Sequence, residues 1–262
     1  MQAFFCYPLR IALIILLLSP SSPANAWGRD GHAIIAAIAE GRLTPEAHMQ
    51  VYALLDGASL ASVSYWADEI RPNRRETSRW HFINFAEGTT GYVPSRDCAY
   101  IQGQGDCIIA AIDRAMAELR TTEGKRIEAL KFLVHFVGDV HQPFHAVATE
   151  RGGNGIRVTF FGKRTNLHAV WDTDLIRQAG RTPETYAKYL ESEWLRGKEI
   201  DAQSLGTPVD WALASRKLGE DAIVPQESQL TLPYYEKFSS VVDQQLALAG
   251  IRLAVLLNAA LR

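Results

Sequence analysis

Residues 135–145 read HFVGDVHQPFH and carry three imidazoles and one carboxylate within eleven residues. The apolar spacing of 131–140 predicts a helix, on which His135 and Asp139 share one face about 5–6 Å apart at their Cβ atoms. Such a pair is a two-ligand clamp for a divalent metal such as zinc. Pro143 ends the helix because it lacks an N–H group, and the turn can bring His145 back toward the same region. A buried histidine bonded to an aspartate in an ordinary core is the alternative, but four polar groups at this spacing would all need partners there.

Further histidines and carboxylates lie on either side of this stretch. His168 and Asp172 repeat the four-residue spacing within NLHAVWDTDLIR, residues 166–177, a segment with helical spacing. The remaining candidates are His32, Asp68 in YWAD, and His81 between two aromatic residues. Taken singly, each is better explained as a hydrogen-bonded structural group. Taken together, they indicate a metal centre.

The composition is that of one globular domain with a sizeable core. The chain has 262 residues, of which 47% are hydrophobic and 21% are charged, and no shift in composition marks a second domain. Residues 156–161 alternate like a strand that turns at Gly162-Lys163 into a small hairpin. The predicted fold is therefore mainly α, a single helical domain with a small β-hairpin. Helices are predicted over residues 31–40 with Asp30 as a possible cap, from Pro45, and over 66–71, 108–119, 127–140, 166–177, 183–195, 208–220 and 239–262.

The last of these helices is strongly apolar. Asp243 and Arg252 interrupt it. We therefore expect it to pack in the core rather than to span a membrane.

Residues 1–26 have the pattern of a cleaved export signal. Arg10 precedes the apolar run IALIILLL at 11–18, and a small-x-small site follows at Ala24–Ala26. A membrane anchor is the alternative, but it requires about 18–20 consecutive apolar residues. Cleavage after Ala26 would leave Trp27 as the first residue of a domain spanning 27–262, in the periplasm or outside the cell.

Removal of this segment changes the charge and the cysteine count. It takes away one of the 27 basic residues and none of the 29 acidic ones, so the mature net charge is −3. It also removes Cys6 and leaves Cys98 and Cys107 as an even pair in an oxidising compartment. A disulfide that closes a small loop is therefore predicted, with two free buried thiols as the alternative.

Taken in order, these motifs resemble the secreted zinc-dependent, single-strand-specific nucleases of fungi and plants, the tri-zinc type I nucleases. This family shares a helical fold with bacterial zinc phospholipase C. The resemblance rests on the tryptophan at the start of the mature chain, WAD, HF, HxxxDxHQPxH, GGN and HAVWD, which follow one another between Trp27 and Asp172. It implies a secreted zinc-dependent endonuclease that hydrolyses single-stranded DNA and RNA to 5′-phosphate products and also acts as a 3′-nucleotidase.

The resemblance also implies three zinc sites. The α-amine of Trp27 would be a ligand, which gives signal cleavage a chemical role because a nitrogen in a peptide bond has no lone pair to offer. Asp139 would bridge two of the ions. The first site would be held by Asp68, His81, His135 and Asp139, the second by Trp27, His32 and Asp139, and the third by His145, His168 and Asp172.

Four further residues receive roles from the same resemblance. Asp68 would orient the attacking water, and Arg71 would bind the scissile phosphate, since a guanidinium can bind two oxygens at once. Phe82 would stack on a base, and Asn154 in the GGN loop would bond to the edge of that base. The last three have plainer alternatives: Arg71 as a solvated surface residue, Phe82 as core and Asn154 as a turn residue. His141 is interpreted as a residue that orients a ligand.

The implied partners are single-stranded nucleic acid and nucleotides, with a monomeric chain, no stable protein partner and no membrane. A net charge of −3 would repel phosphate, but three divalent ions would bring the total to about +3, concentrated at the site.

Zinc phospholipase C is the first alternative to this function. The short gap from Trp27 to His32, and Asp172 where phospholipases carry glutamate, oppose it. The second is a non-catalytic secreted zinc-binding protein with closed coordination, which Arg71 and Phe82 oppose.

Overall fold

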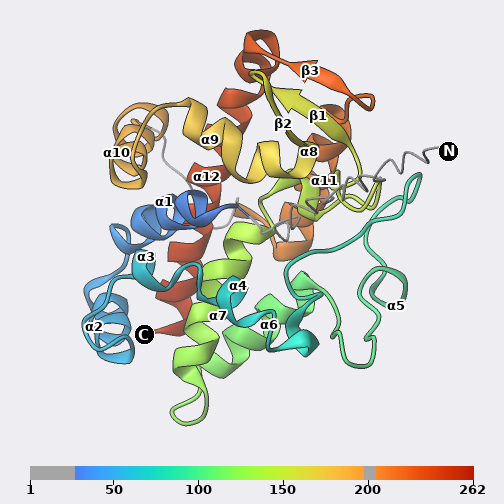
Figure 1. Cartoon of the computed structure of the whole chain (residues 1–262). Helices are drawn as coiled ribbons and strands as arrows, with labels where there is room; N and C mark the ends of the chain where they lie inside the picture. The colour runs from blue at the N-terminus through green and yellow to red at the C-terminus, as the bar shows by residue number, and fades with distance from the viewer. Residues whose placement is uncertain (1–26, 198–204) are drawn as a thin grey trace, which may run out of the picture.

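The computed structural model describes residues 27–197 and 205–262 (Figure 1). The predicted export signal, residues 1–26, lies outside the described residues. The elements, in chain order, are α1 (Arg29–Glu40), α2 (Pro45–Leu54), α3 (Leu60–Val63), α4 (Trp66–Ile70), η1 (Arg75–Thr77), α5 (Pro94–Asp97), α6 (Ile108–Leu119), α7 (Arg126–Asp139), η2 (Pro143–His145), β1 (Arg157–Phe160), β2 (Lys163–Asn166), α8 (Leu167–Ala169), η3 (Val170–Asp174), α9 (Leu175–Gln178), α10 (Pro183–Tyr189), η4 (Leu190–Trp194), α11 (Pro208–Ala222), β3 (Ser228–Leu230) and α12 (Leu232–Ala260). This is the mainly α architecture with little β structure that the sequence predicts.

The long helix α12 forms the core together with α1 and α7 (Figure 1). It is long and apolar enough to cross a membrane by length and composition alone. However, Leu246, Leu253 and Leu257 are fully buried along it. At Gly250 the packing against α1 is so close that a Cβ atom would lie 2.5 Å from the side chain of Ile38. This is the packing expected of a core helix.

Helix α7 carries the central motif into the interior. It packs against α6, α12, α1 and α4, and every residue from Phe132 to Asp139 is buried. His135 and Asp139 therefore project from a rigid helix into a region without bulk water. Pro143 begins the 3₁₀ turn η2 after a short break, and this turn carries His145.

A small sheet with strand order β2-β1-β3 lies beside α8 (Figure 1). The predicted hairpin is confirmed: β1 and β2 pair antiparallel, with Arg157 opposite Asn166 and Phe160 opposite Lys163. Strand β3 was not predicted. It has three residues, too few to show a period of two, and pairs parallel to β1.

Most predicted helices lie within a few residues of their observed ends, and the exceptions have local causes. Helix α1 begins at Arg29 with Gly28 as its cap, so the prediction that Asp30 caps it is wrong; Asp30 lies in the first turn. Helix α12 begins at Leu232, seven residues earlier than predicted, with a proline in its first turn. The four-residue helices α3 and α5 are too short to give a helical period.

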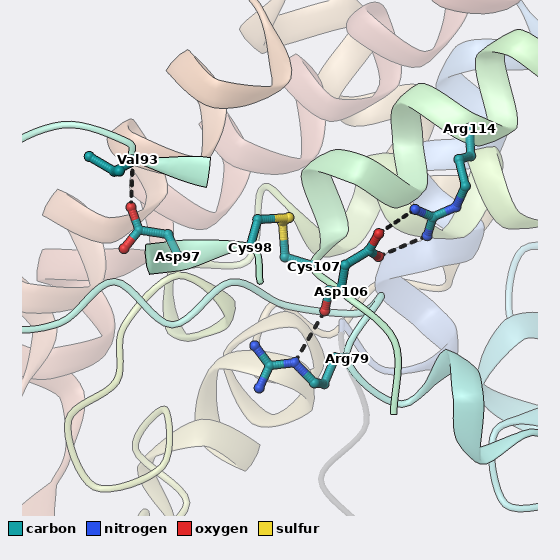
Figure 2. The surroundings of a disulfide bond; sticks show 7 residues. All are labelled: Arg79, Val93, Asp97, Cys98, Asp106, Cys107 and Arg114. Atoms are coloured by element: carbon teal, nitrogen blue, oxygen red, sulfur yellow. Dashed lines mark hydrogen bonds and ion pairs between the residues drawn. A yellow bond between two sulfur atoms is a disulfide. The ribbon is translucent and has the colours of Figure 1, made fainter. Parts of the chain in front are cut away.

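The disulfide between Cys98 and Cys107 is present, and it ties the loop before α6 to the N-terminus of that helix (Figure 2). Next to it, Arg114 donates two hydrogen bonds to the carboxylate of Asp106, at 2.5 and 2.9 Å. Arg79 donates to the carbonyl oxygen of Asp106 at 3.2 Å. The loop is thereby fixed to the segment that leads into His81.

Candidate metal centre

Asp139 lies at the centre of the first two predicted ligand sets. Its Oδ1 faces Nε2 of His32 at 3.2 Å. Its Oδ2 faces Nδ1 of His81 at 3.0 Å and Nε2 of His135 at 3.2 Å. Asp68 completes this cluster, with Oδ1 3.5 Å from His81 and 3.7 Å from His135. The two oxygens of one buried carboxylate thus serve two neighbouring groups of histidines.

Close packing holds these rings in place. The ring of His32 stacks on that of His135 with centroids 4.0 Å apart. It fits against α7 at Gly138, where a Cβ atom would lie 2.7 Å from Nδ1 of His32. Only glycine leaves this space, so Gly138 contributes to the site although it carries no side chain.

A second cluster contains His145, His168 and Asp172, as predicted. Nε2 of His168 lies 3.3 Å from Oδ2 of Asp172, and the rings of His145 and His168 have centroids 5.1 Å apart. Asp172 belongs to the π-helical segment Val170–Asp174, and such segments occur frequently at functional sites. Gln142 donates a hydrogen bond to Oδ1 of Asp172.

Hydrogen bonds to backbone carbonyls fix the tautomers of three histidines. Nδ1 of His135 donates to the carbonyl of Ser64 at 2.8 Å, that of His145 to the carbonyl of His81 at 2.6 Å, and that of His168 to the carbonyl of Gly152 at 2.5 Å. A carbonyl only accepts, so Nδ1 carries the proton in each ring. In the neutral form of each ring Nε2 is then the atom with a free lone pair, which is the usual arrangement of a metal-ligating histidine.

The charge states differ among these groups. Burial lowers the pKa of His32 and of His145 to about 4 and that of His168 to about 3, so these rings are neutral at neutral pH. Burial also raises the pKa of Asp68, and it raises that of Asp172 well above its usual value. At His135 burial lowers the pKa, but the charges of Asp139 and Asp68 outweigh it and raise the value to about 9.

The donor set fits divalent metal ions. Several nitrogen and oxygen atoms that could bind a metal are buried without a hydrogen-bond partner among the described residues. Such atoms cost free energy unless something else binds them. They include both oxygens of Asp68, both ring nitrogens of His32, and Nε2 of His81 and His168. Ligands about 2.0–2.1 Å from a tetrahedral zinc ion lie about 3.3 Å from one another, close to the distances above. Imidazole and carboxylate are ligands that zinc accepts.

Trp27 lies next to the segment that carries Asp172. Its side chain is fully buried. The next residue, Gly28, donates its backbone N–H to the carbonyl of Asp172 at 2.7 Å. The start of the predicted mature chain is thus joined to the segment that carries the last predicted ligand.

A cleft of about 330 Å³ opens over the second cluster. It is lined on one side by Arg71, Phe82 and Asn84 and on the other by His145, His168 and the loop 148–154. Arg71 and Phe82 are half-buried, and Asn154 donates to the carbonyl of Arg151 at 3.0 Å. The predicted substrate residues therefore lie together beside the predicted ligands. Asn84 and Arg151 also line the cleft, and no motif marked them.

The sequence model of the S1/P1 nuclease family matches residues 27–262. The chain belongs to this family. It is 32% identical to Nuclease P1 of Penicillium citrinum over 268 residues. This alignment covers 88% of this chain and 97% of the relative. It is also 32% identical to Nuclease S1 of Aspergillus oryzae, over 88% of this chain and 91% of the relative. Endonuclease 2 of Arabidopsis thaliana is 29% identical over 94% of each chain.

Membership of the S1/P1 nuclease family confirms the predicted enzyme class, a nuclease that hydrolyses phosphodiester bonds. The zinc dependence of the family agrees with the histidine and aspartate clusters on α1, α4, α7 and α8. The phospholipase and the non-catalytic alternatives receive no support from these relatives.

The interpretation of His141 as a residue that orients a metal ligand is wrong, because its ring contacts none of the predicted ligands. Its Nδ1 donates to the carbonyl of Val137 at 2.7 Å, and its Nε2 lies 2.7 Å from the guanidinium of Arg252 on α12. The ring points away from the clusters because it is on the α12 side of the turn after α7. Gln142, to which no role was assigned from the sequence, is the neighbour that contacts a predicted ligand.

A larger groove of about 660 Å³ lies between α6 and α7. Alanines, aromatic rings and charged side chains such as Arg74 and Glu128 line it, and none of the predicted ligands does. The smaller cleft is therefore the candidate active site of this S1/P1 nuclease.

Proposed function

We propose that residues 27–262, after export and removal of residues 1–26, form a zinc-dependent nuclease with three zinc ions. The enzyme hydrolyses single-stranded DNA and RNA to 5′-phosphate products and removes the 3′-phosphate of nucleotides. The observation that carries the proposal is the position of two neighbouring clusters of buried histidines and aspartates beside a cleft with a cation and an aromatic ring. Several atoms of these clusters have no hydrogen-bond partner among the described residues.

We assign the ligands as the resemblance to the family implies. Asp68, His81, His135 and Asp139 would hold the first ion. His32, Asp139 and the α-amine and carbonyl of Trp27 would hold the second. His145, His168 and Asp172 would hold the third. Zinc ions bound in this way supply an activated water and neutralise charge on the phosphodiester.

Two side chains, Asp68 and Arg71, position the attacking water and the phosphate. Both oxygens of Asp68 lack a hydrogen-bond partner in the described structure, so this carboxylate accepts a hydrogen bond from the attacking water and orients it. Arg71 binds the phosphate in the cleft, where a guanidinium can bind two oxygens. One of its nitrogens donates to the carbonyl of Ser78 at 3.0 Å, which holds the side chain in place.

Phe82 accounts for the preference for single strands. Stacking on an aromatic side chain is worth about 1–3 kcal/mol per base and is tolerant of sequence. A base in a duplex is already paired and stacked, so it reaches the ring only at the cost of leaving the helix. Asn154 borders the same cleft and binds the edge of that base.

The test is hydrolysis of single-stranded DNA by protein that begins at Trp27, before and after chelation and after zinc is added back. A duplex of the same sequence is the control. We expect cleavage that is lost on chelation, restored by zinc and much slower on the duplex. Absence of cleavage by protein with its full zinc content would refute the proposed function.

A further inference from the structure

The hairpin β1–β2 extends directly from the candidate site. Gly152, in the loop before β1, accepts the hydrogen bond from His168. Asn166, the last residue of β2, caps α8 by accepting from Ala169 at 2.9 Å, and α8 carries His168. Both strands therefore begin or end at the second cluster, and the hairpin leads away from the cleft for about 13 Å at 3.3 Å per residue.

One face of this sheet is buried and the other is exposed. Val158, Phe160 and Leu230 are buried on the inner face. The strand register places Arg164 opposite Thr159 and Asn166 opposite Arg157, and residues in such pairs point to the same side. The outer face thus carries Arg157, Thr159, Arg164, Asn166 and Gln229.

The two guanidiniums of this face are exposed and have no ion-pair partner among the described residues. Lys163, on the inner side, pairs with Asp174 at 3.2 Å. Two carboxylates lie near the ends of the sheet: Glu150 against Gly155, and Glu227, whose backbone N–H bonds to the carbonyl of Arg157. Neither pairs with an arginine of the face, so both guanidiniums are available to an anion.

The tip of the hairpin has an unusual residue. Phe161 is 42% exposed and adopts a φ of 44°. This left-handed region suits asparagine, aspartate or glycine in a two-residue hairpin turn, and it strains a bulky side chain. Such an outlier is a reason to look for a function of the residue that adopts it. The ring of Phe161 packs edge-on against Phe160, with centroids 4.9 Å apart, and stays partly exposed at the tip. Arg164 follows it by three residues, and Arg157 lies at the base of the hairpin.

We infer that the outer face and tip of this hairpin, Arg157, Arg164 and Phe161, bind the part of a single-stranded nucleic acid that extends beyond the cleft. Guanidiniums bind the backbone phosphates and the ring of Phe161 stacks on a base, which is the combination used by sequence-tolerant single-strand binders. The surface is continuous with the cleft through Arg151 in the loop before β1. This inference rests on the proposed function and adds a second binding region to it.

The experiment compares a dinucleotide, which fills only the cleft, with an oligonucleotide of about 12 nucleotides. The zinc-loaded variant Arg157→Gln/Arg164→Gln should raise KM for the oligonucleotide about tenfold at low salt, with kcat unchanged. The dependence of log(kcat/KM) on log salt should lose about 0.7 per lost phosphate contact. Hydrolysis of the dinucleotide should not change.

Phe161→Asn tests the tip separately because asparagine tolerates the same turn conformation. It should raise KM for the oligonucleotide about fivefold or more, again without effect on the dinucleotide. The matched control is Arg120→Gln/Lys125→Gln, which removes two charges from the turn between α6 and α7, at the opposite end of the molecule from the sheet (Figure 1). This control should behave as wild type on both substrates.

The outcomes separate the two proposals. If the wild-type enzyme cuts neither substrate, the proposed function fails. If it cuts both, and the hairpin variants match it or the control on the oligonucleotide, the hairpin surface is refuted. An equal loss on both substrates would also refute it, because a dinucleotide does not reach this face.

Discussion

Asp139 contacts two groups of histidines at once because a carboxylate has two oxygens that point in different directions. A buried charge shared in this way is costly unless cations or hydrogen bonds compensate it. In the protein alone, His135 supplies that compensation and, with His81 and His32, holds the pKa of Asp139 well below its usual value against the effect of burial. Metal binding would replace the proton of His135 by a cation that lies between Asp139 and its neighbouring histidines.

Asp139→Asn should lower kcat/KM at least about 100-fold and reduce the zinc content, since an amide presents only one oxygen and no charge. Metal analysis and hydrolysis of single-stranded DNA measure the two effects. Asp174→Asn, which changes an aspartate paired with an exposed lysine, is the matched control. Normal turnover with full zinc content in Asp139→Asn would exclude the three-site assignment.

Gly138→Ala separates the site from the stability of the helix. The new Cβ would lie 2.7 Å from Nδ1 of His32 and displace that ring. Alanine in a helix is otherwise favoured over glycine by about 0.5–1 kcal/mol, which offsets part of the roughly 1–3 kcal/mol that overpacking costs. The metal-free protein should therefore lose no more than about 2 kcal/mol of stability. We expect the zinc content and activity to fall, about tenfold for activity. Gly41→Ala is the control, because its Cβ would meet only atoms at 3.7 Å or more. Equal activity of the two variants would contradict the role of Gly138.

His135 makes zinc uptake dependent on pH. In the metal-free protein its pKa is about 9, so the ring is protonated at neutral pH and must lose that proton to bind a cation. Zinc binding should therefore release a proton, and the affinity should rise with pH up to about 9. Calorimetry in two buffers of different ionisation enthalpy measures the release. The same apparent enthalpy in both buffers would show that no proton leaves.

At the scale of elements, the strongest predictions came from long periodic segments and from spacing within one helix. The pairs His135–Asp139 and His168–Asp172 are four residues apart, so local geometry alone places each pair on one face. The packing of α1, α4, α7 and α8 around the site cannot be derived from spacing within one helix, because it depends on how α12 packs in the core. The resemblance to a family was needed to assign His32 and Asp68 to the same sites as the central motif. Asn84 and Arg151 lie on irregular segments with no period, and β3 is defined by its partner strand.

The direction of His141 was also beyond the sequence. A histidine two residues after Asp139 looks like part of the same cluster, but the turn after α7 reverses its direction. Its partners on α12, Arg252 and Gln245, are more than a hundred residues away along the chain. Periodicity reports which face of an element a residue occupies, and it says nothing about a residue in a turn.

The disulfide is expected to stabilise one element and to leave the ligands intact. It closes a loop with a sequence separation of 9, worth about 2–3 kcal/mol in loop entropy. Cys98→Ser/Cys107→Ser should lower the melting temperature by about 5–10 °C. Ile108, next to Cys107, donates its N–H to the carbonyl of Phe82 at 3.2 Å, so KM should also rise while the zinc content stays constant. Loss of zinc in this variant would contradict the expectation.

At the scale of the whole molecule, the predicted ligands come from segments spread between Trp27 and Asp172. Helix α12 packs against α1, α7 and α9 and so connects several of these segments. No single segment carries a complete set. The metal centre should therefore form only when the domain has folded, and metal loss should loosen several elements together.

A chain that keeps one extra residue before Trp27 tests whether the α-amine is a ligand. Its nitrogen would be part of a peptide bond, so the protein should bind about one zinc ion fewer than protein that begins at Trp27. Metal analysis of both proteins under identical loading gives the answer. Equal stoichiometry would refute the assignment of the amine.

The burial of Trp27, with its neighbour Gly28 bonded to Asp172, has a consequence for the cell that makes this enzyme. A precursor that still carries residues 1–26 cannot present the free amine, so on our assignment it stays inert while it is near the ribosome and the messenger RNA that encode it. On the same assignment, removal of residues 1–26 would act as an activation step. The RNA of the producing cell would then be protected from this enzyme until that cut is made.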